Sequence, residues 1–470
     1  MATIFGASQI ALIVTFVIAY IVITTMLSIW TMKFTKSNEH FMTAGGQLPF
    51  WIIGLLMISE YIGTSATVGT AQASFDNGIA AAWSIVTFVI VFPLFGWFIA
   101  PKFYEMREYT ISGVLNRQYG KSTRVMTSVI MIYALLVVNV ANYVGGAAAV
   151  SSVLKVSLPV AALITAGVTI VYVAVGGLRS VAYVNLIHFA FKYLAVIIVV
   201  IVGVGLGASY SNMLAKLPEV YFTSVGKIGL PTIIAWGLAN LGAVFSTQMT
   251  IQAVASVKSV SDARKASLIA GLLAVPMGIL ATYIGLQSKY LFPTIKSVMA
   301  LPIFIHHMNP WLGSIVTAGI VATVFANVSA TSLAITALAM KDFIVPLAKP
   351  SEEGKLRISR IVSIFIGLLP LPFVLLVPTI IKTMFFAKAL RTSLSVVAVM
   401  GFYLPFFKSD RGATWGLIIA AVGASVWYFS GEPFHIDSTY VAIALPVIIL
   451  ILDRLLSRRK YTESEKDMKA

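Results

Sequence analysis

The sequence predicts an all-α polytopic membrane protein with about 13 transmembrane helices. Hydrophobic residues make up 59% of the chain and charged residues only 11%, a composition too apolar for a soluble protein. The apolar residues fall into runs of roughly 20, the length that spans a bilayer as a helix. No polar run between them is long enough for a soluble domain, so we expect a chain that crosses the membrane repeatedly.

The predicted spans follow one another with short polar connections. The first is too long for the apolar part of a signal peptide and lacks an evident cleavage site, so we expect it to be retained as a helix. The longest predicted outer loops are 208–228 and 289–311. In chain order the spans are 8–31, 49–72, 78–100, 124–150, 157–175, 181–207, 229–253, 267–288, 312–338, 358–379, 383–406, 412–429 and 439–453.

The basic residues orient the chain. With the N-terminus outside, most of the 33 Lys and Arg residues fall in cytoplasmic loops and in the tail, as the positive-inside rule requires. Three lie at membrane depth: Lys192, Lys388 and Arg391. We therefore expect a multi-pass protein of the plasma (inner) membrane with a cytoplasmic C-terminus, and the net charge of +16 needs no nucleic acid to explain it. The six outer-loop residues are Lys155, Lys216, Lys227, Lys289, Lys296 and Lys382.

Glu60 differs from the other acidic residues, which fall in loops, at helix ends or in the tail. It lies inside the second span, in the stretch LLMISEYIGTSATVGTAQ. An ionisable group at bilayer depth is costly and indicates a functional role by default. The alternative is a neutral Glu60 that hydrogen-bonds to a neighbouring helix.

Two spans have the composition of broken helices, which bind solute at the membrane midplane in many transporters. In the first, Gly63 lies between Glu60 and a run of hydroxyl residues that includes Thr64 and Ser65. The second, AWGLANLGAVFSTQMTIQ, combines two glycines with polar side chains. Freed backbone groups in such segments face a cavity rather than lipid. The candidate solute-binding residues are Glu60, Gly63, Thr64, Ser65, Asn240, Gln248 and Gln252.

Each broken span begins a possible five-helix repeat, and this divides the chain into parts. The predicted parts are an N-terminal extra helix (1–32), a first repeat (49–207), a second, inverted repeat (229–406), two extra helices (412–453) and a charged, frayed cytoplasmic tail (454–470).

Several motifs resemble the sodium:solute symporter family. The stretch VYVAVGGLRSVAYVNLIH (171–188) is similar to the family signature, and four other stretches follow the family pattern in order. This resemblance implies a leucine-transporter-like core of two inverted five-helix repeats, with one helix before it and two after it. It implies a cation:solute symporter that works by alternating access. These four stretches are EHFMTAGGQLPFW, YTISGVLNRQYG, STQMTIQAVASVKSVSDARKAS and AMKDFI.

The sodium site that the resemblance implies is altered in this chain. The family uses backbone carbonyls of the first core helix, which fall here on Ser59 and Ile62, and groups of the eighth core helix. On that helix the carbonyl position is Thr323 and the two hydroxyl positions are Ala326 and Asn327. Alanine supplies no side-chain oxygen, although Asn327 can supply one.

The register on the eighth helix leaves two alternatives open. A shift of three residues would place Ser329 and Ala330 at the hydroxyl positions, which restores no better site. A longer shift would reach Thr331 and Ser332 but requires a helical insertion that the sequence does not show.

A second departure lies in the family signature itself. The Asp that relatives associate with cation binding is Asn185 here, and Lys192 stands where relatives have an apolar or small residue. Asn185, His188 and Lys192 share one helix face, and by the fold resemblance this helix borders the sodium site. One hypothesis is that Lys192 replaces the cation and exchanges protons with Glu60. The alternatives are a snorkelling Lys192 with a packing role for His188, or sodium bound with oxygens from Glu60 or Asn327.

The solute is the least determined feature. Glu60 followed by hydroxyl residues resembles the monocarboxylate branch of the family, and the amides near Gly63 and Thr64 could hold a carboxylate. Lys388 and Arg391 could attract an anion, or could instead face a vestibule or lipid headgroups. A monocarboxylate or an amino acid is favoured, whereas sugars, vitamins and urea stay open because the fold does not fix the solute.

Other classes of protein fit less well. No catalytic triad, metal-binding spacing, P-loop or dinucleotide fingerprint occurs, so we expect no enzyme and no cofactor beyond a coupling ion, Na+ or H+. The absence of cysteine excludes disulfides and thiolate metal sites. A channel is disfavoured because no re-entrant filter sequence appears. A transporter-like sensor is the rival that stays open, and we expect a monomer in the bilayer.

Overall fold

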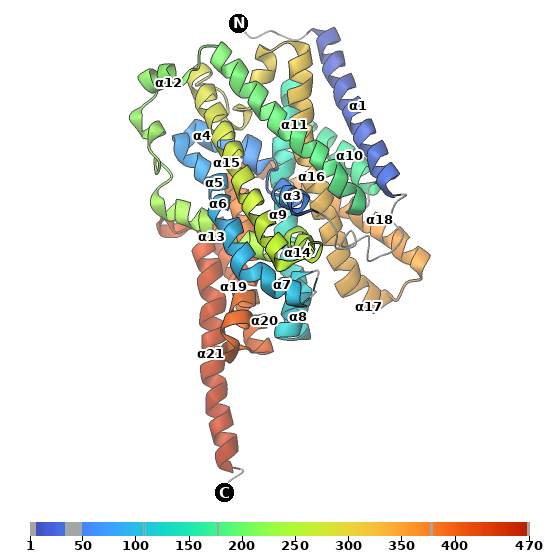
Figure 1. The fold of residues 1–470 in the computed structure, drawn as a ribbon, viewed down its shortest axis with the longest axis vertical. Helices are drawn as coiled ribbons and strands as arrows, with labels where there is room; N and C mark the ends of the chain where they lie inside the picture. Colours follow the sequence, from blue (N-terminus) through green and yellow to red (C-terminus); the bar gives the residue numbers. More distant parts are fainter. Residues whose placement is uncertain are drawn as a thin grey trace.

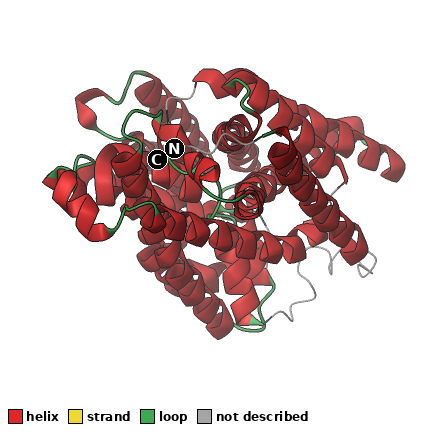
Figure 2. Cartoon of the chain, turned by 90° about the horizontal axis from the view of Figure 1, so that it is seen from above, coloured by secondary structure: helices red, strands yellow, loops and turns green. Residues whose placement is uncertain are grey.

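The computed structural model describes residues 6–32, 49–106, 108, 110–175, 178–376 and 379–467. The regular structure of this described part is helical throughout (Figure 2). Ten of its helices are long and apolar enough to cross a membrane. Shorter apolar helices begin at Phe50, Leu158 and Leu230, and they occupy the remaining predicted spans.

The first half of the chain forms the extra N-terminal helix and the first set of core helices (Figure 1). Several spans are divided by 3-10 or π-helical turns, which Pro93 and the glycines of the sequence permit. The elements are α1 (Ala7–Met32), α3 (Phe50–Ser59), η2 (Ser65–Gly69), α4 (Thr70–Asn77), η3 (Gly78–Ala82), α5 (Trp83–Val86), α6 (Phe88–Leu94), η4 (Phe95–Ile99), α7 (Ala100–Met106), α8 (Ile111–Gln118), α9 (Lys121–Leu154), α10 (Leu158–Val175) and α11 (Leu178–Gly205).

The second half of the chain contains the elements α12 to α21. Short helices cross the predicted outer loops, where the sequence indicated only polar connections. The elements are α12 (Tyr210–Lys216), η5 (Glu219–Phe222), α13 (Leu230–Ser246), α14 (Gln248–Ala255), α15 (Val260–Leu291), η6 (Ser297–Met299), η7 (Pro302–His307), α16 (Pro310–Ala339), η8 (Met340–Ile344), α17 (Val345–Ala348), α18 (Glu352–Leu368), η9 (Leu371–Leu376), α19 (Ile380–Tyr403), η10 (Pro405–Phe407), α20 (Asp410–Phe429), η11 (Pro433–His435) and α21 (Ser438–Asp467).

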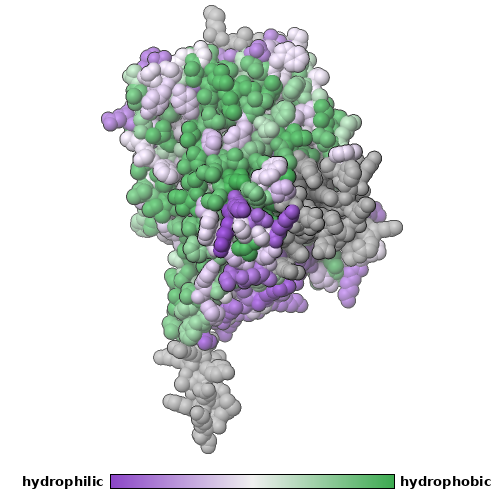
Figure 3. All heavy atoms as spheres, in the orientation of Figure 1, coloured by the Kyte–Doolittle hydropathy of each residue, from purple (hydrophilic) through white to green (hydrophobic). Residues whose placement is uncertain are grey.

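The two chain ends lie at opposite ends of the molecule (Figure 1). The short helix α12 lies near the N-terminal end and α8 lies toward the C-terminal end, as an alternating in-and-out path requires. A broad belt of apolar side chains covers the body, and polar side chains gather below it toward the C-terminal end (Figure 3). Large apolar side chains such as Ile201 and Leu272 are more than half exposed in this belt, which is the pattern of a lipid-facing surface.

Helix packing places the two broken spans at the centre. The α16 helix packs against α9 and α11, α13 packs against α19, and α15 packs against α3 and α4. Hydroxyl and amide side chains cap many of the helices that reach the surface, as Thr110 does for α8 and Ser259 does for α15. The expectation of a frayed tail is wrong for its backbone, because α21 continues as a helix to Asp467.

Candidate functional site

The first core span breaks next to Glu60. The α3 helix ends at Ser59, and residues 60–64 leave the regular helix before η2 resumes it at Ser65. Gly63 fits this break because a Cβ atom there would lie 1.5 Å from Nδ2 of Asn327 on α16. Only a residue without a side chain lets α16 approach the break so closely.

The second core span breaks at Thr247. The α13 helix ends at Ser246, and Thr247 has extended backbone angles (φ −69°, ψ 126°) before α14 begins. The Tyr61 hydroxyl donates a hydrogen bond to Oγ1 of Thr247 over 2.6 Å. The two breaks therefore meet, as in transporters that bind solute between discontinuous helices.

Lys192 of α11 reaches the first break. Its Nζ atom donates a hydrogen bond to the carbonyl oxygen of Ser59 over 3.2 Å, and the side chain is 0% exposed. No carboxylate of the described chain forms an ion pair with it. The ammonium group thus lies at a carbonyl that the sequence predicted for a cation site.

The α16 helix supplies the other predicted cation-site positions. Oγ1 of Thr323 lies 3.3 Å from Oγ1 of Thr64, and Asn327 packs on Gly63. Both residues therefore face the first break, in the register predicted from the sequence. Ala326 is buried on the same helix and adds no side-chain oxygen.

Thr331 and Ser332, the residues that the longer register shift would use, form hydrogen bonds to α9. Thr331 donates a hydrogen bond to Oδ1 of Asn139 on α9, and Nδ2 of Asn139 donates to Oγ of Ser332 over 3.3 Å. Both hydroxyls therefore contact Asn139 of α9, and Thr331 lies one turn after Asn327 on α16.

Three oxygen atoms near the first break are buried without a hydrogen-bond partner. They are Oγ of Ser59, Oε2 of Glu60 and Oδ1 of Asn327. Buried polar atoms in native proteins are normally paired, so unpaired ones indicate a place that an ion, water or solute completes. Ile62, the other predicted carbonyl position, is fully buried beside them.

The predicted polar face of α11 divides between two neighbours. His188 hydrogen-bonds through Nδ1 to the hydroxyl of Tyr20 on α1, whereas Lys192 contacts α3. Asn185 is buried on the same helix at 3% exposure. The extra N-terminal helix is therefore tied to the helix that carries Lys192.

A second polar cluster lies between α13 and α19. Nζ of Lys388 donates a hydrogen bond to Oδ1 of Asn240 over 2.7 Å. Nδ2 of Asn240 donates to the Ser84 carbonyl over 3.0 Å and to Oγ1 of Thr87 over 2.7 Å. A guanidinium nitrogen of Arg391 donates to the Ala243 carbonyl over 3.1 Å.

Lys388 and Arg391 are 6% and 5% exposed, so neither contacts lipid headgroups. The Phe88 ring links this cluster to the first break, because its centroid lies 4.8 Å from that of Tyr61 and 5.4 Å from Nζ of Lys388. Contacts from the first break, the second break and α19 therefore converge in one buried region.

The structure describes only some of the remaining predicted solute-binding residues. Ser65 is buried, and its carbonyl accepts a hydrogen bond from Thr70 over 3.1 Å. The side chains of Gln248 and Gln252 lie outside the described residues, as do residues 176–177 of the signature. The Tyr61–Thr247 contact was missed from sequence, where the only available signal was a hydroxyl residue beside each predicted break.

A cavity of about 280 Å³ lies where α4, the start of α19 and the loop between α20 and α21 meet. Gln72 and Trp236 line it together with residues of the loop between α20 and α21, among them Glu432 and Asp437. Trp236 stacks on Phe385 with ring centroids 4.9 Å apart and ring planes 11° apart. This stacked pair lies between the cavity and Lys388, whose Nζ is 4.3 Å from the Phe385 ring centroid.

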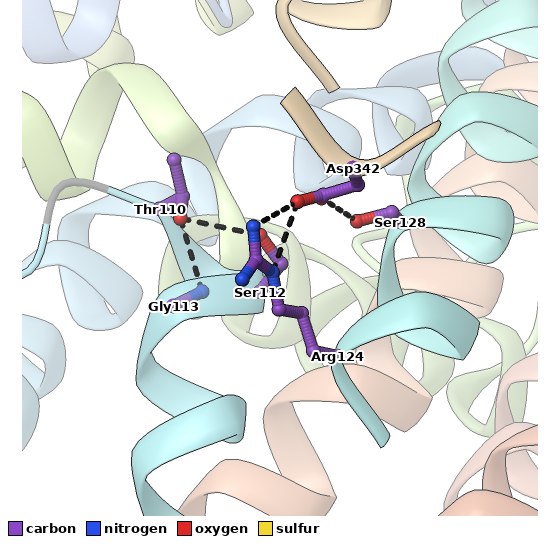
Figure 4. A network of polar contacts seen from close by, with 6 residues as sticks. All are labelled: Thr110, Ser112, Gly113, Arg124, Ser128 and Asp342. Atoms are coloured by element: carbon purple, nitrogen blue, oxygen red, sulfur yellow. Dashed lines mark hydrogen bonds and ion pairs between the residues drawn. The ribbon is translucent and has the colours of Figure 1, made fainter. Parts of the chain in front are cut away.

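A polar network joins helices near the opposite end (Figure 4). Arg124 of α9 binds Oδ1 of Asp342 in η8 with N–O distances of 2.5 and 2.9 Å, and Ser128 donates to Oδ2. Thr110 caps α8 beside this pair by accepting a hydrogen bond from the Gly113 amide over 3.0 Å. The network fastens the start of α9 to the end of the span formed by α16 and η8.

Comparison with known proteins gives a consistent result. Residues 41–420 match the model of the sodium:solute symporter family. The sodium/glucose cotransporter of Vibrio parahaemolyticus is 27% identical over 66% of this chain, and the match spans 63% of that relative, less than two thirds of its length. The sodium/myo-inositol cotransporter 2 of Oryctolagus cuniculus is 21% identical over 86% of this chain and 67% of its own.

Solved structures show the same fold. A Na+-coupled sialic acid symporter in a substrate-bound, outward-open state has a TM-score of 0.80 at 15% identity, over 95% of this chain and 98% of its own. The nucleobase-cation-symport-1 family transporter Mhp1, closed on bromovinylhydantoin, has a TM-score of 0.58 at 13% identity, over 89% and 95%. These structures share the leucine-transporter-like fold. The chain belongs to the sodium:solute symporter family, a family of secondary transporters rather than enzymes, and it is a multi-pass membrane protein.

Proposed function

We propose that this transporter moves a small polar or anionic organic solute by alternating access, with the Lys192 ammonium in place of a sodium ion at the core cation site. The observation that carries the proposal is the hydrogen bond from Nζ of Lys192 to the Ser59 carbonyl. The carbonyl is one that the family resemblance assigns to sodium.

Electrostatic repulsion supports the replacement of a sodium ion by Lys192. Two unit charges about 4 Å apart repel each other by about 4 kcal/mol at an effective dielectric constant near 20. A sodium ion on Ser59 would lie this close to a charged Lys192, and no described carboxylate pairs with the ammonium. Ala326 also removes a side-chain oxygen that sodium would need, because hard cations require several oxygen ligands.

In this proposal, solute transport is coupled to protons or to no ion. Oε2 of Glu60 is buried without a partner, and Lys192 is buried without a counter-charge. Desolvation disfavours the charged form of both side chains, so each can change its protonation state as water reaches it from one side of the membrane. Glu60 follows Ser59 directly, which places both groups at one break; His188 is a further proton-coupling candidate on α11.

Sodium coupling through a modified site is the second candidate. The unpaired oxygens Oδ1 of Asn327 and Oγ of Ser59 favour it, because together with Thr323 they could contribute oxygen ligands near the first break. It requires that Lys192 move away from the Ser59 carbonyl when the ion binds.

The orientation in the proposal is N-terminus outside and C-terminus cytoplasmic, in the plasma (inner) membrane. The distribution of Lys and Arg between the two sets of loops supports it. The cavity lined by Gln72 and Trp236 then opens to the outside, and the Arg124–Asp342 network lies near the cytoplasm. Two inverted repeats at 49–207 and 229–406 supply the alternating halves.

The test starts with thermal unfolding of the purified protein with small acids, amino acids and sugars, in sodium and in choline salts. A stabilising solute is then offered to proteoliposomes under an imposed sodium or proton gradient. The proposal predicts uptake that follows the proton gradient, or equilibration without any driving ion. Sodium-driven accumulation with no response to a pH gradient would contradict it, and binding without any transport would indicate a solute sensor.

A further inference from the structure

The buried centre of the molecule carries more positive than negative charge. Lys192, Lys388 and Arg391 are buried at 0%, 6% and 5% exposure. Glu60 is the acid within the same region, and Asp342 is paired with Arg124 elsewhere. Uncompensated buried charge is strongly unfavourable, so a ligand of opposite charge is the simplest completion of the site.

We propose that Lys388 and Arg391 form the carboxylate-binding part of the solute site, which takes a small organic acid with a net negative charge. This proposal rests on the proposed function only in assuming that solute passes between the two broken helices. It is independent of which ion drives transport.

The geometry places both cations on one face of α19. Lys388 and Arg391 lie three positions apart on α19, as do their acceptors Asn240 and Ala243 on α13. Side chains at this spacing are neighbours on a helix surface. Their charges therefore act together, close to the second break at Thr247.

Both cations keep donors for a further acceptor. An ammonium group has three donor hydrogens, and Asn240 accepts one of those of Lys388. Nε of Arg391 is buried without a hydrogen-bond partner. Charge-assisted bonds from Lys and Arg to a carboxylate are stronger than neutral hydrogen bonds, and a carboxylate could use these free donors.

Aromatic rings supply an apolar wall beside the two cations. Nζ of Lys388 lies 5.4 Å from the Phe88 ring centroid and 4.3 Å from that of Phe385. Trp236, which stacks on Phe385, also lines the outer cavity. A ligand approaching from that cavity would meet rings first and cations next, which suits an acid with a short apolar body.

Net charge distinguishes an organic anion from the other candidate ligands. A neutral sugar would leave the positive charges of Lys192, Lys388 and Arg391 uncompensated. An amino-acid zwitterion could place its ammonium near Glu60, but it would leave the net charge of the region unchanged. An organic anion lowers that net charge, and so it gains the most from binding here.

The experiment uses the full chain in detergent and choline chloride, without sodium. Its thermal midpoint is measured with propionate and lactate, with the matched amides propionamide and lactamide, and with alanine. A ligand that binds only the folded state raises the midpoint. We expect saturable stabilisation by the acids and none by the amides or by alanine.

Variants then assign the response to the two cations. Arg391→Gln and Lys388→Met are expected to weaken the acid response about tenfold or more through the lost charge-assisted bonds, and Arg391→Lys to restore part of it. Lys296→Met, which removes an exposed lysine that does not line the cavity, is the matched control and should respond like the natural chain.

Equal or larger shifts with the amides or alanine, or no shift with any acid in either choline chloride or sodium chloride, would overturn the proposal. If a variant does not fold, the acid–amide comparison on the natural chain decides the matter. An acid response that requires sodium would contradict the proposed coupling while leaving the ligand class intact. A sodium-independent response to sugars alone would contradict the proposed ligand class while leaving the proposed coupling intact.

Discussion

The ammonium of Lys192 donates a hydrogen bond to the carbonyl oxygen of Ser59 over 3.2 Å. The donor belongs to α11 and the acceptor to the last turn of α3, so this bond joins an unbroken core helix to a broken one. Relative movement of α3 and α11 must break or redirect the bond. It therefore couples the charge state of Lys192 to the conformation of the site.

The contact between the two breaks gives the first prediction. Tyr61→Phe removes the hydroxyl that donates to Thr247 over 2.6 Å, and it keeps the ring packed 4.8 Å from that of Phe88. We expect a loss of stability of about 0.5–1.5 kcal/mol and slower transport, because the broken segments are held less firmly. Thermal unfolding and uptake in proteoliposomes measure the two effects.

The matched control for that variant is Tyr143→Phe. It removes a similar hydrogen bond, from Tyr143 on α9 to the Gly367 carbonyl over 2.9 Å, away from both breaks. Its stability loss should be similar and its uptake rate unchanged. Equal slowing of uptake by both variants would show that the Tyr61–Thr247 bond has no special role.

Close packing of α9 against the first break gives the second prediction. A Cβ atom on Gly145 would lie 1.8 Å from Cγ2 of Thr64. Gly145→Ala should therefore lower stability by about 1–3 kcal/mol through overpacking. Thr64→Ser removes that methyl group alone, so the double variant should recover most of the loss in thermal unfolding. Failure of this rescue would mean that the methyl contact is not the cause.

The Arg124–Asp342 pair gives the third prediction. Asp342→Asn leaves Arg124 without its counter-charge, and Asp342 is 1% exposed. Breaking a fully buried pair costs about 3–5 kcal/mol, and we expect about 2 kcal/mol here because water screens an Arg124 side chain that keeps 31% exposure. Thermal unfolding measures the loss.

A surface pair provides the control for that variant. Lys102 and Glu105 are 3.8 Å apart with 41% and 66% exposure, so Glu105→Gln should change stability by less than about 0.5 kcal/mol. Equal losses in Asp342→Asn and Glu105→Gln would contradict a structural role for the buried network.

Glu432, in the loop between α20 and α21, gives the fourth prediction. Burial raises the pKa of this carboxyl above its ordinary value of 4.5, and the nearby Asp437 adds to the effect, while Lys382 opposes it. Between the unfolded and folded pKa values the folded chain holds the extra proton. Protonation of Glu432 thus favours the folded state, and stability falls as the pH rises through this window.

The measurement is the thermal midpoint of the purified protein from pH 4.5 upward. Glu432→Gln should flatten the fall in this range while keeping the oxygen that accepts from the Ser438 amide. Asp437→Asn should flatten it less, because burial is the larger cause. An unchanged pH profile in Glu432→Gln would rule out this carboxyl as the source.

The sequence was sufficient for the spans and for both helix breaks. Runs of about 20 apolar residues define the spans, and Gly63 beside hydroxyl residues marks the first break because lipid cannot satisfy freed backbone groups. Helical spacing along the sequence was enough to predict that Lys192 lies at mid-span. Its partner could be predicted only through the family resemblance, which assigned the Ser59 carbonyl to a cation; the role of the contact in transport stays a prediction.

Other contacts depend on helix packing that no local pattern reveals. Asn240 was predicted to bind solute, yet its amide also joins Ser84, Thr87 and Lys388, each from a different element of the fold. Nothing in the sequence indicated that Tyr20 of the extra helix would meet His188. The helix in the tail was not predicted, because many charged residues are typical of a solvated, irregular chain end.

Direct binding of radioactive sodium, 22Na+, to the purified protein tests the central claim. With Lys192 in place of the ion, the natural chain should show no saturable binding, whereas Lys192→Ala, which frees the Ser59 carbonyl, should gain it. Saturable 22Na+ binding to the natural chain, at about one ion per molecule and lost in Asn327→Ala, would contradict the account.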